Sequence, residues 1–118
     1  MAKENEKVLE ACLAKAQNLI GLVEYANDSI VSKTILDKAA GSITLFAFDE
    51  GQNLSEHTSP YDAVLQILDG TAQIIIGGNN NNVSSNEIII MPANTPHSVN
   101  AQEKFKMLLI MIRTKEQK

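Results

Sequence analysis

The hydrophobic pattern of the chain changes near residue 29. Before it, apolar residues recur at intervals of three and four, which is the repeat of an amphipathic helix. The pattern predicts a helix over residues 4–16, whose apolar face would hold Leu9, Cys12, Leu13 and Ala16. The following segment, NLIGLVEY, predicts one more short turn of helix, and Gly21 within it argues against a single long helix.

After residue 29, short apolar segments alternate with turn residues. Segments of this length, rich in β-branched residues, are typical of strands in an antiparallel sandwich or barrel. The predicted strands are SIVSKTI, GSITLFAFDE, DAVLQILDG, TAQIIIG, NEIIIMP and KFKMLLIMI. Several are apolar on both faces. One face would fill the barrel, and the other would pack on the N-terminal segment, on a second sheet or on another subunit.

The run GGNNNN, residues 77–82, separates two of these strands. Gly and Asn tolerate positive φ, so the run predicts a hairpin or a loop. No internal repeat or linker divides the strand-rich part. For a chain of 118 residues, we therefore predict a helical extension over residues 1–28 and a single barrel over residues 29–118.

Composition and charge restrict the classes of function. The residues are 44% hydrophobic and 20% charged, as in a globular protein. The net charge is −4 and no basic stripe is present, which argues against a nucleic-acid partner. The single cysteine, Cys12, cannot form an intrachain disulfide. Neither a signal peptide nor an apolar run of membrane-spanning length is visible, so we expect a cytoplasmic protein with no membrane partner.

Two spaced motifs lie in the strand-rich part. They consist of Gly51, His57, Ser59, Ala63 and Gly70, then of Asn86, Pro92, Asn94, His97 and Ala101. Fifteen residues intervene between the two motifs. The arrangement resembles the paired motifs of the cupin family and covers roughly residues 40 to 113. The resemblance implies an all-β fold, an antiparallel cupin barrel (a double-stranded β-helix, or jelly roll), here with a short N-terminal helical segment.

The resemblance also implies where a metal would bind. Metal-binding cupins place ligands at the positions occupied here by His57, Ser59, Ala63 and His97, and only the two histidines are usual ligands. Metal sites normally use three or four protein ligands. Side chains alternate along a strand, so the carboxylates adjacent in sequence to these positions would point outward. A β-bulge would shift that alternation, and the sequence gives no clear sign of one.

Several interpretations of the site stay open. In the first, His57, Ser59, Ala63 and His97 form a pocket for a small molecule, with the histidines as polar anchors and no complete metal site. In the second, His57 and His97 hold Fe, Mn, Ni or Zn in a dioxygenase-type or isomerase-type enzyme, with water completing the shell. A structural or interaction module is the third. In the fourth interpretation, the two histidines have no ligand and only form hydrogen bonds within the barrel. The missing ligands favour the first interpretation over the second.

Two further expectations concern the barrel. The small Ala63 side chain predicts a small cavity beside the histidines. Met91, Met107 and Met111 would either fill the core or line such a pocket. Cupins often form homodimers, and the strands that are apolar on both faces agree with a homodimer here.

Overall fold

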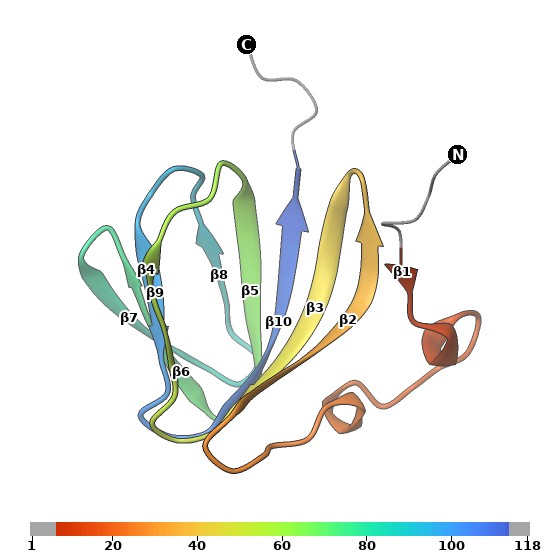
Figure 1. Cartoon of the computed structure of the whole chain (residues 1–118). Helices are drawn as coiled ribbons and strands as arrows, with labels where there is room; N and C mark the ends of the chain where they lie inside the picture. The colour runs from red at the N-terminus through yellow and green to blue at the C-terminus, as the bar shows by residue number, and fades with distance from the viewer. Residues whose placement is uncertain (1–6, 114–118) are drawn as a thin grey trace.

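The computed structural model describes residues 7–113, and strands account for most of them (Figure 1). One antiparallel sheet has the order β1-β2-β3-β10-β5-β8. Its strands are β1 (Lys7–Val8), β2 (Ile30–Lys38), β3 (Gly41–Phe48), β10 (Phe105–Ile112), β5 (Asp62–Asp69) and β8 (Ile88–Met91). The second sheet has the order β4-β9-β6-β7. Its strands are β4 (Asn53–His57), β9 (His97–Asn100), β6 (Thr71–Ile76) and β7 (Asn79–Ser84).

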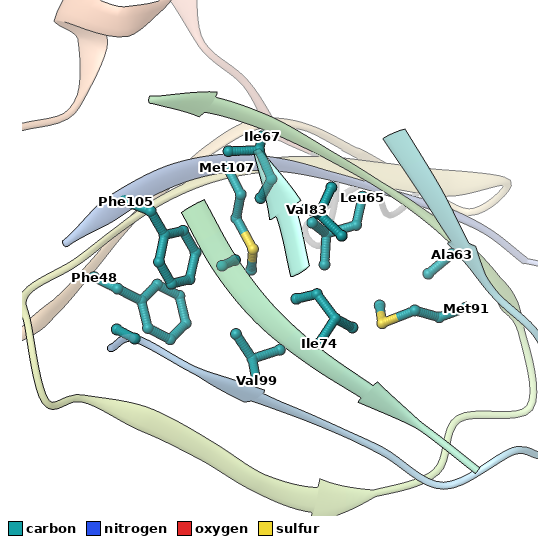
Figure 2. Packing of buried hydrophobic residues seen from close by; sticks show 12 residues of the cluster. Phe48, Ala63, Leu65, Ile67, Ile74, Val83, Met91, Val99, Phe105 and Met107 are labelled. Atoms are coloured by element: carbon teal, nitrogen blue, oxygen red, sulfur yellow. The ribbon is translucent and has the colours of Figure 1, made fainter. Parts of the chain in front are cut away.

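The core lies between the two sheets. Alternate residues of β5 point inward, so that Ala63, Leu65 and Ile67 are buried while Gln66 lies on the outer face, as its position in the strand predicts. Figure 2 shows these side chains meeting residues of the second sheet. At one end of the core the rings of Phe48 and Phe105 stack with their centroids 4.6 Å apart. The predicted antiparallel barrel is therefore confirmed.

The helix predicted over residues 4–16 is wrong for the part that the structure describes, and residues 4–6 lie outside that part. Lys7–Val8 pair with β2, and only Glu10–Cys12 form a single turn of 3-10 helix. Two local features oppose a helix. Ala14 has a φ of 58°, and Leu13, on the expected apolar face, is 61% exposed. Pairing with β2 thus overrides local helical periodicity.

Residues 19–25 cover part of the outer face of the six-stranded sheet. They contain the 3-10 turn Ile20–Leu22, which matches the short turn predicted there. Val23 is buried with Leu45 and Ala47 of β3 in a second apolar cluster. This contact explains why β3 is apolar on both faces. The division of the chain at residues 28 and 29 stays a prediction.

Polar contacts hold this segment against the sheet. The Tyr25 hydroxyl donates to the Asp69 carboxylate at 2.6 Å, and the Lys106 ammonium donates to the carbonyl of Ile20 at 2.8 Å. Burial, then the hydrogen bond to Asp69, raises the pKa of Tyr25 above its usual value. The phenol therefore stays neutral, as its role of hydrogen-bond donor requires.

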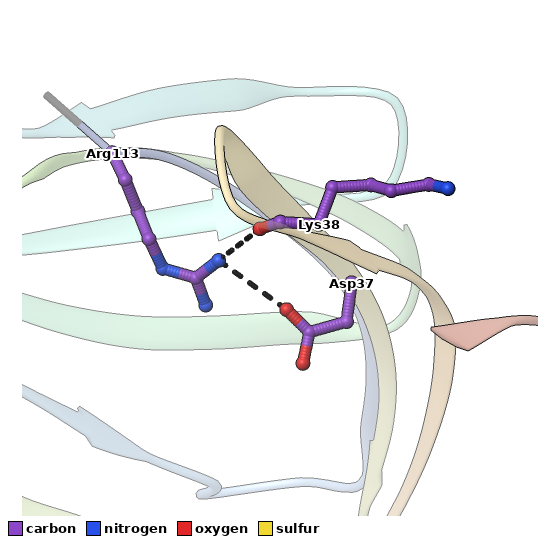
Figure 3. A network of polar contacts seen from close by, with 3 residues as sticks. All are labelled: Asp37, Lys38 and Arg113. Atoms are coloured by element: carbon purple, nitrogen blue, oxygen red, sulfur yellow. Dashed lines mark hydrogen bonds and ion pairs between the residues drawn. The ribbon is translucent and has the colours of Figure 1, made fainter. Parts of the chain in front are cut away.

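Arg113, directly after β10, binds the end of β2 and the turn that follows it. The Arg113 guanidinium donates to the Asp37 carboxylate at 3.3 Å and to the carbonyl of Lys38, as Figure 3 shows. The Arg113 amide also donates to the carbonyl of Ala40 at 2.8 Å. Among residues 7–113, no helix has the length and hydropathy needed to cross a bilayer.

The sequence pattern does not predict three strands of the second sheet, β4, β7 and β9. The run GGNNNN forms the predicted hairpin, but only Gly77 and Gly78, both at positive φ, make its turn. The four asparagines that follow continue as strand β7 and pair with β6. Asparagine has a low strand propensity, so cross-strand pairing decides the conformation of this segment.

Candidate functional site

A cavity of about 120 Å³ lies between the two sheets. It is lined mainly by apolar side chains, namely Phe46, Leu54, Ala63, Leu65, Met91, Val99, Met107, Leu109 and Met111, together with His57, Ser59 and His97. All four residues of the predicted pocket therefore line one cavity, and the predicted space beside Ala63 is present. The three methionines also line it, while Met91 and Met107 belong to the buried core as well.

A β-bulge in β4 aims His57 into this cavity. Leu54 pairs with Val99 and His57 pairs with His97, so β4 holds one more residue than β9 over the same span. Leu54 and His57 are three positions apart, yet both line the cavity. The sequence gives no clear sign of this bulge. It does not bring the neighbouring carboxylate inward, since Glu56 is exposed and is not among the lining residues.

The two histidine rings meet edge to face, with centroids 4.4 Å apart and planes at 68°. Each Nδ1 lies within hydrogen-bond distance of the carbonyl two residues upstream, Ser55 at 2.8 Å and Thr95 at 3.0 Å. A carbonyl oxygen only accepts, so we assign the proton of each neutral ring to Nδ1. Nε2 of each ring is then the nitrogen left to accept a hydrogen bond or to bind a metal.

The two histidines differ in access. His97 is buried, with 6% of its surface exposed, whereas His57 is an exposed residue. His57 thus lies at the mouth of the cavity and His97 lies inside it.

The other two predicted pocket residues add little coordinating capacity. The Ser59 hydroxyl accepts a hydrogen bond from the Tyr61 amide at 3.1 Å, and Ala63 offers no polar side-chain atom. Asp62 points away from the cavity and accepts from the Ala93 amide at 2.8 Å. This contact, with the Asn94 amide donating to the Ser59 carbonyl at 2.7 Å, holds the loop before β9 against the site.

These residues do not fit a complete metal centre. Within residues 7–113 no group of three or more His, Cys, Asp or Glu side chains is placed to hold one ion. The cavity supplies two imidazole nitrogens, one fewer than a three-ligand site requires.

The second motif has asparagine at two turn positions, and the backbone conformation explains why. The glycines of the first motif, Gly51 and Gly70, have φ of 90° and 77°. In the second motif Asn86 and Asn94, at positions where the resemblance to cupins implies frequent glycines, have φ of 72° and 64°. Asparagine is the residue after glycine that most readily adopts this left-handed conformation. The substitutions therefore preserve the turns of the motif.

Sequence reasoning missed Leu54 and Val99 as lining residues. Both lie on strands that the sequence pattern does not predict, and no apolar alternation marks such short strands.

The matching family model decides the affiliation: the model described as "Cupin domain" matches residues 44–113. The chain belongs to the cupin family. No curated protein matches it. This cupin is similar to a conserved protein of unknown function from Streptococcus pyogenes, at 36% identity over 88% of this chain and 91% of the other, with a TM-score of 0.84.

Two further solved structures are similar to this cupin. A cupin 2 conserved barrel domain protein from Leptotrichia buccalis is 38% identical over 82% of this chain and 47% of the other, with a TM-score of 0.80. A salicylate 1,2-dioxygenase from Pseudaminobacter salicylatoxidans is 12% identical over 74% of this chain and 27% of the other, with a TM-score of 0.66. The last likeness shows a shared fold alone.

Proposed function

We propose that this cupin binds a small molecule in the cavity between its sheets, with His57 and His97 as polar anchors. The observation that carries the proposal is the pairing of two oriented imidazoles with a lining that is otherwise apolar except for Ser59. Because each Nδ1 is engaged by a backbone carbonyl, the two Nε2 atoms are the acceptors offered to a ligand. A ligand that donates a hydrogen bond and carries an apolar body satisfies both features.

The size of the cavity limits the part of the ligand that enters it. An apolar protein cavity of about 150 Å³ holds benzene. The cavity here, about 120 Å³, is slightly smaller, so a single substituted ring would fill it and reach its mouth at His57. Since His57 is exposed at the mouth, a longer ligand would extend past it into solvent.

A thermal-shift titration with phenol and toluene tests this function. The two probes have the same number of heavy atoms, and only phenol donates a hydrogen bond. We expect phenol to bind about tenfold more tightly, because its hydroxyl reaches an imidazole acceptor. At 100 times its Kd it would stabilise the protein by about 2.7 kcal/mol. A His97→Leu variant should lose the preference for phenol while still binding toluene.

Matched variants on the two faces of β5 serve as controls. Ala63→Leu fills the cavity and should abolish the response to both probes, whereas Gln66→Leu, on the outer face of the same strand, should leave it intact. The proposal fails if neither probe raises the melting temperature of the wild-type protein, or if Ala63→Leu responds as strongly as the wild type.

A metal-dependent enzyme of dioxygenase or isomerase type is the second candidate. The hydrogen bonds from both Nδ1 atoms to carbonyls favour it, because metal-bound histidines are commonly oriented in this way. The incomplete ligand set favours the first proposal. Elemental analysis of untagged protein purified without chelator separates the two. Stoichiometric Fe, Mn, Ni or Zn that is lost in a His57→Ala variant would establish the metal-dependent alternative.

We also propose that this cupin forms a homodimer through the outer face of the six-stranded sheet. Ile90, Val64, Ile110 and Ile43 lie in one cross-strand row over β8, β5, β10 and β3. Ile88, Ile90 and Ile112, on this face, are 59–64% exposed. Residues 19–25 cover only the other part of the face. A second copy would cover this row with the same row of its own, as a two-fold interface requires.

Light scattering coupled to size exclusion measures this assembly. The wild-type protein should elute as a dimer, and an Ile88→Lys/Ile90→Lys variant as a monomer, because two lysines would be buried in the interface. Leu13→Lys, which changes an exposed leucine elsewhere, should remain dimeric. A wild-type protein with the mass of one chain contradicts the proposal.

A further inference from the structure

The outer face of the four-stranded sheet is polar but carries almost no charge. Strands β6, β7 and β9 contain no Asp, Glu, Lys or Arg, in a chain whose residues are 20% charged. Solvated surfaces normally intersperse charged side chains of both signs. Among the four strands only β4 holds an Asp, Glu, Lys or Arg residue, the exposed Glu56, so a ligand on this face would meet few charged groups.

Primary amides line up across this face in register. Asn53 of β4 pairs with Asn100 of β9, Asn100 with Gln73 of β6, and Gln73 with Asn82 of β7. Adjacent strands lie about 4.8 Å apart, so the four amides form one continuous row. Their sequence neighbours Leu54, Val99, Ile74 and Val83 point to the opposite face of the sheet, into the barrel. The row is thus separate from the histidine cavity.

A groove lies over three of the four amides of this row, those of Asn53, Asn100 and Gln73. It is lined by five primary amides, from Gln52, Asn53, Gln73, Asn100 and Gln102, together with Glu50, Gly51 and Ala101. Its volume of about 320 Å³ exceeds that of the histidine cavity. None of its lining residues is aromatic or cationic.

One hydrogen bond orients the central pair of amides. Asn100 Nδ2 donates to Gln73 Oε1 at 3.1 Å. Asn100 Oδ1 is then left as an acceptor, and Gln73 Nε2 is left as a donor beside it. A ligand that offers a donor and an acceptor on adjacent atoms would satisfy both groups, and a pair of vicinal hydroxyls has this property.

We propose that the groove formed by Gln52, Asn53, Gln73, Asn100 and Gln102 binds a neutral saccharide. Phosphate and carboxylate ligands would lack a cation in the groove, and a cationic ligand would meet only the single carboxylate of Glu50. Hydroxyl groups of a sugar match amides, which both donate and accept. Without an aromatic ring to stack on the sugar, a few hydrogen bonds give a Kd on the order of 1 mM.

Chemical-shift titration of ¹⁵N-labelled protein with maltotetraose and with cellotetraose tests this proposal, since side-chain amide signals report directly on the groove. At least one probe should cause saturable shifts at the side-chain amides of Gln73 and Asn100. Gln73→Ala should raise the Kd about tenfold, because the hydrogen bond from Gln73 Nε2 to the sugar is lost and Asn100 loses the partner that orients it. Asn80→Ala, on the same face but outside the groove, should bind as the wild type does.

Two results would overturn the proposal. They are the absence of saturable shifts with both saccharides, whether or not spermidine causes them at the groove, and an unchanged Kd in Gln73→Ala. Spectra of each variant without ligand check that its fold is kept, which is expected because Gln73 is only half-buried and Asn80 is exposed. None of these outcomes depends on ligand binding in the histidine cavity.

Discussion

Replacing Gly70 with alanine should lower the free energy of unfolding by roughly 2–5 kcal/mol. Gly70 has a φ of 77°, where a residue with a Cβ atom is strained. A Cβ atom at this position would also lie 2.4 Å from the carbonyl oxygen of Lys104 and 3.1 Å from Cα of Phe105. Both are backbone atoms, so no side-chain rotation relieves the contact. The start of β10 would have to move away from the turn between β5 and β6.

Gly51→Ala is the matched control for this prediction. Gly51 has a φ of 90°, but a Cβ atom there would meet nothing within 4 Å. Only the conformational strain remains, about 1–2 kcal/mol. Urea unfolding of the two variants measures the difference, because the midpoint shifts in proportion to stability when the slope is unchanged. Equal losses in the two variants would show that the close approach of β10 to Gly70 has no energetic role.

The double substitution Ser59→His/Ala63→Glu should create a metal site and tighten metal binding by more than about 100-fold. Both positions line the cavity with His57 and His97, so the variant would direct three imidazoles and a carboxylate at one space. Changes to outer-shell partners alone alter metal affinity 10–100-fold, and new direct ligands should do more. Calorimetric titration of the metal-free wild type and of the metal-free variant with Zn²⁺ gives the two affinities.

The stability of this double variant provides a second measurement. Without metal, the carboxylate introduced at position 63 would be buried, since Ala63 is only 4% exposed, and the variant should be less stable than the wild type. Zn²⁺ should restore its stability, because a ligand that binds only the folded state stabilises it. Adding His57→Ala should remove most of that gain. Wild-type affinity equal to that of the double variant would mean that the two imidazoles already form a sufficient site.

The sequence predicts β2, β3, β5 and β10 of the six-stranded sheet well because each has eight or nine residues and a largely apolar pattern. DAVLQILDG alternates buried and outer residues along β5, and its prediction is confirmed. Strand β9 has only four residues, HSVN, and β7 begins with four asparagines. Neither segment has the apolar alternation that predicts a strand, and its polar residues suit a turn equally well. Both therefore become strands through pairing with β6.

In the N-terminal segment, by contrast, the sequence carries a signal for a helix that does not form. Its helical periodicity is present in the sequence, but the apolar side chains do not share a buried face. Leu13 is largely exposed, while the amide of Leu9 donates to the carbonyl of Ile35 in β2. Hydrogen bonds to the free edge of the sheet stabilise this backbone more than an isolated helical turn would, because nucleating a helix is energetically costly.

The candidate site could be located but not fully described from the sequence. Motif spacing brings His57, Ser59, Ala63 and His97 to one cavity, as the resemblance implies. The edge-to-face contact of the imidazoles and the fixed Nδ1 hydrogen bonds depend on the pairing of β4 with β9. That pairing includes the bulge, and no residue type between Leu54 and His57 predicts a bulge.

The bulge in β4 makes the chemistry of the cavity depend on strand length. Upstream of the bulge the inward side of β4 carries Leu54, and downstream it carries His57, so a single surplus residue sets which side chain faces inward. Loss of that one residue would rotate either the leucine or the imidazole out to solvent, although both side chains would remain in the sequence. Deletion of one residue between Leu54 and His57 could therefore remove the His57 anchor from the cavity, with no substitution at the histidine itself.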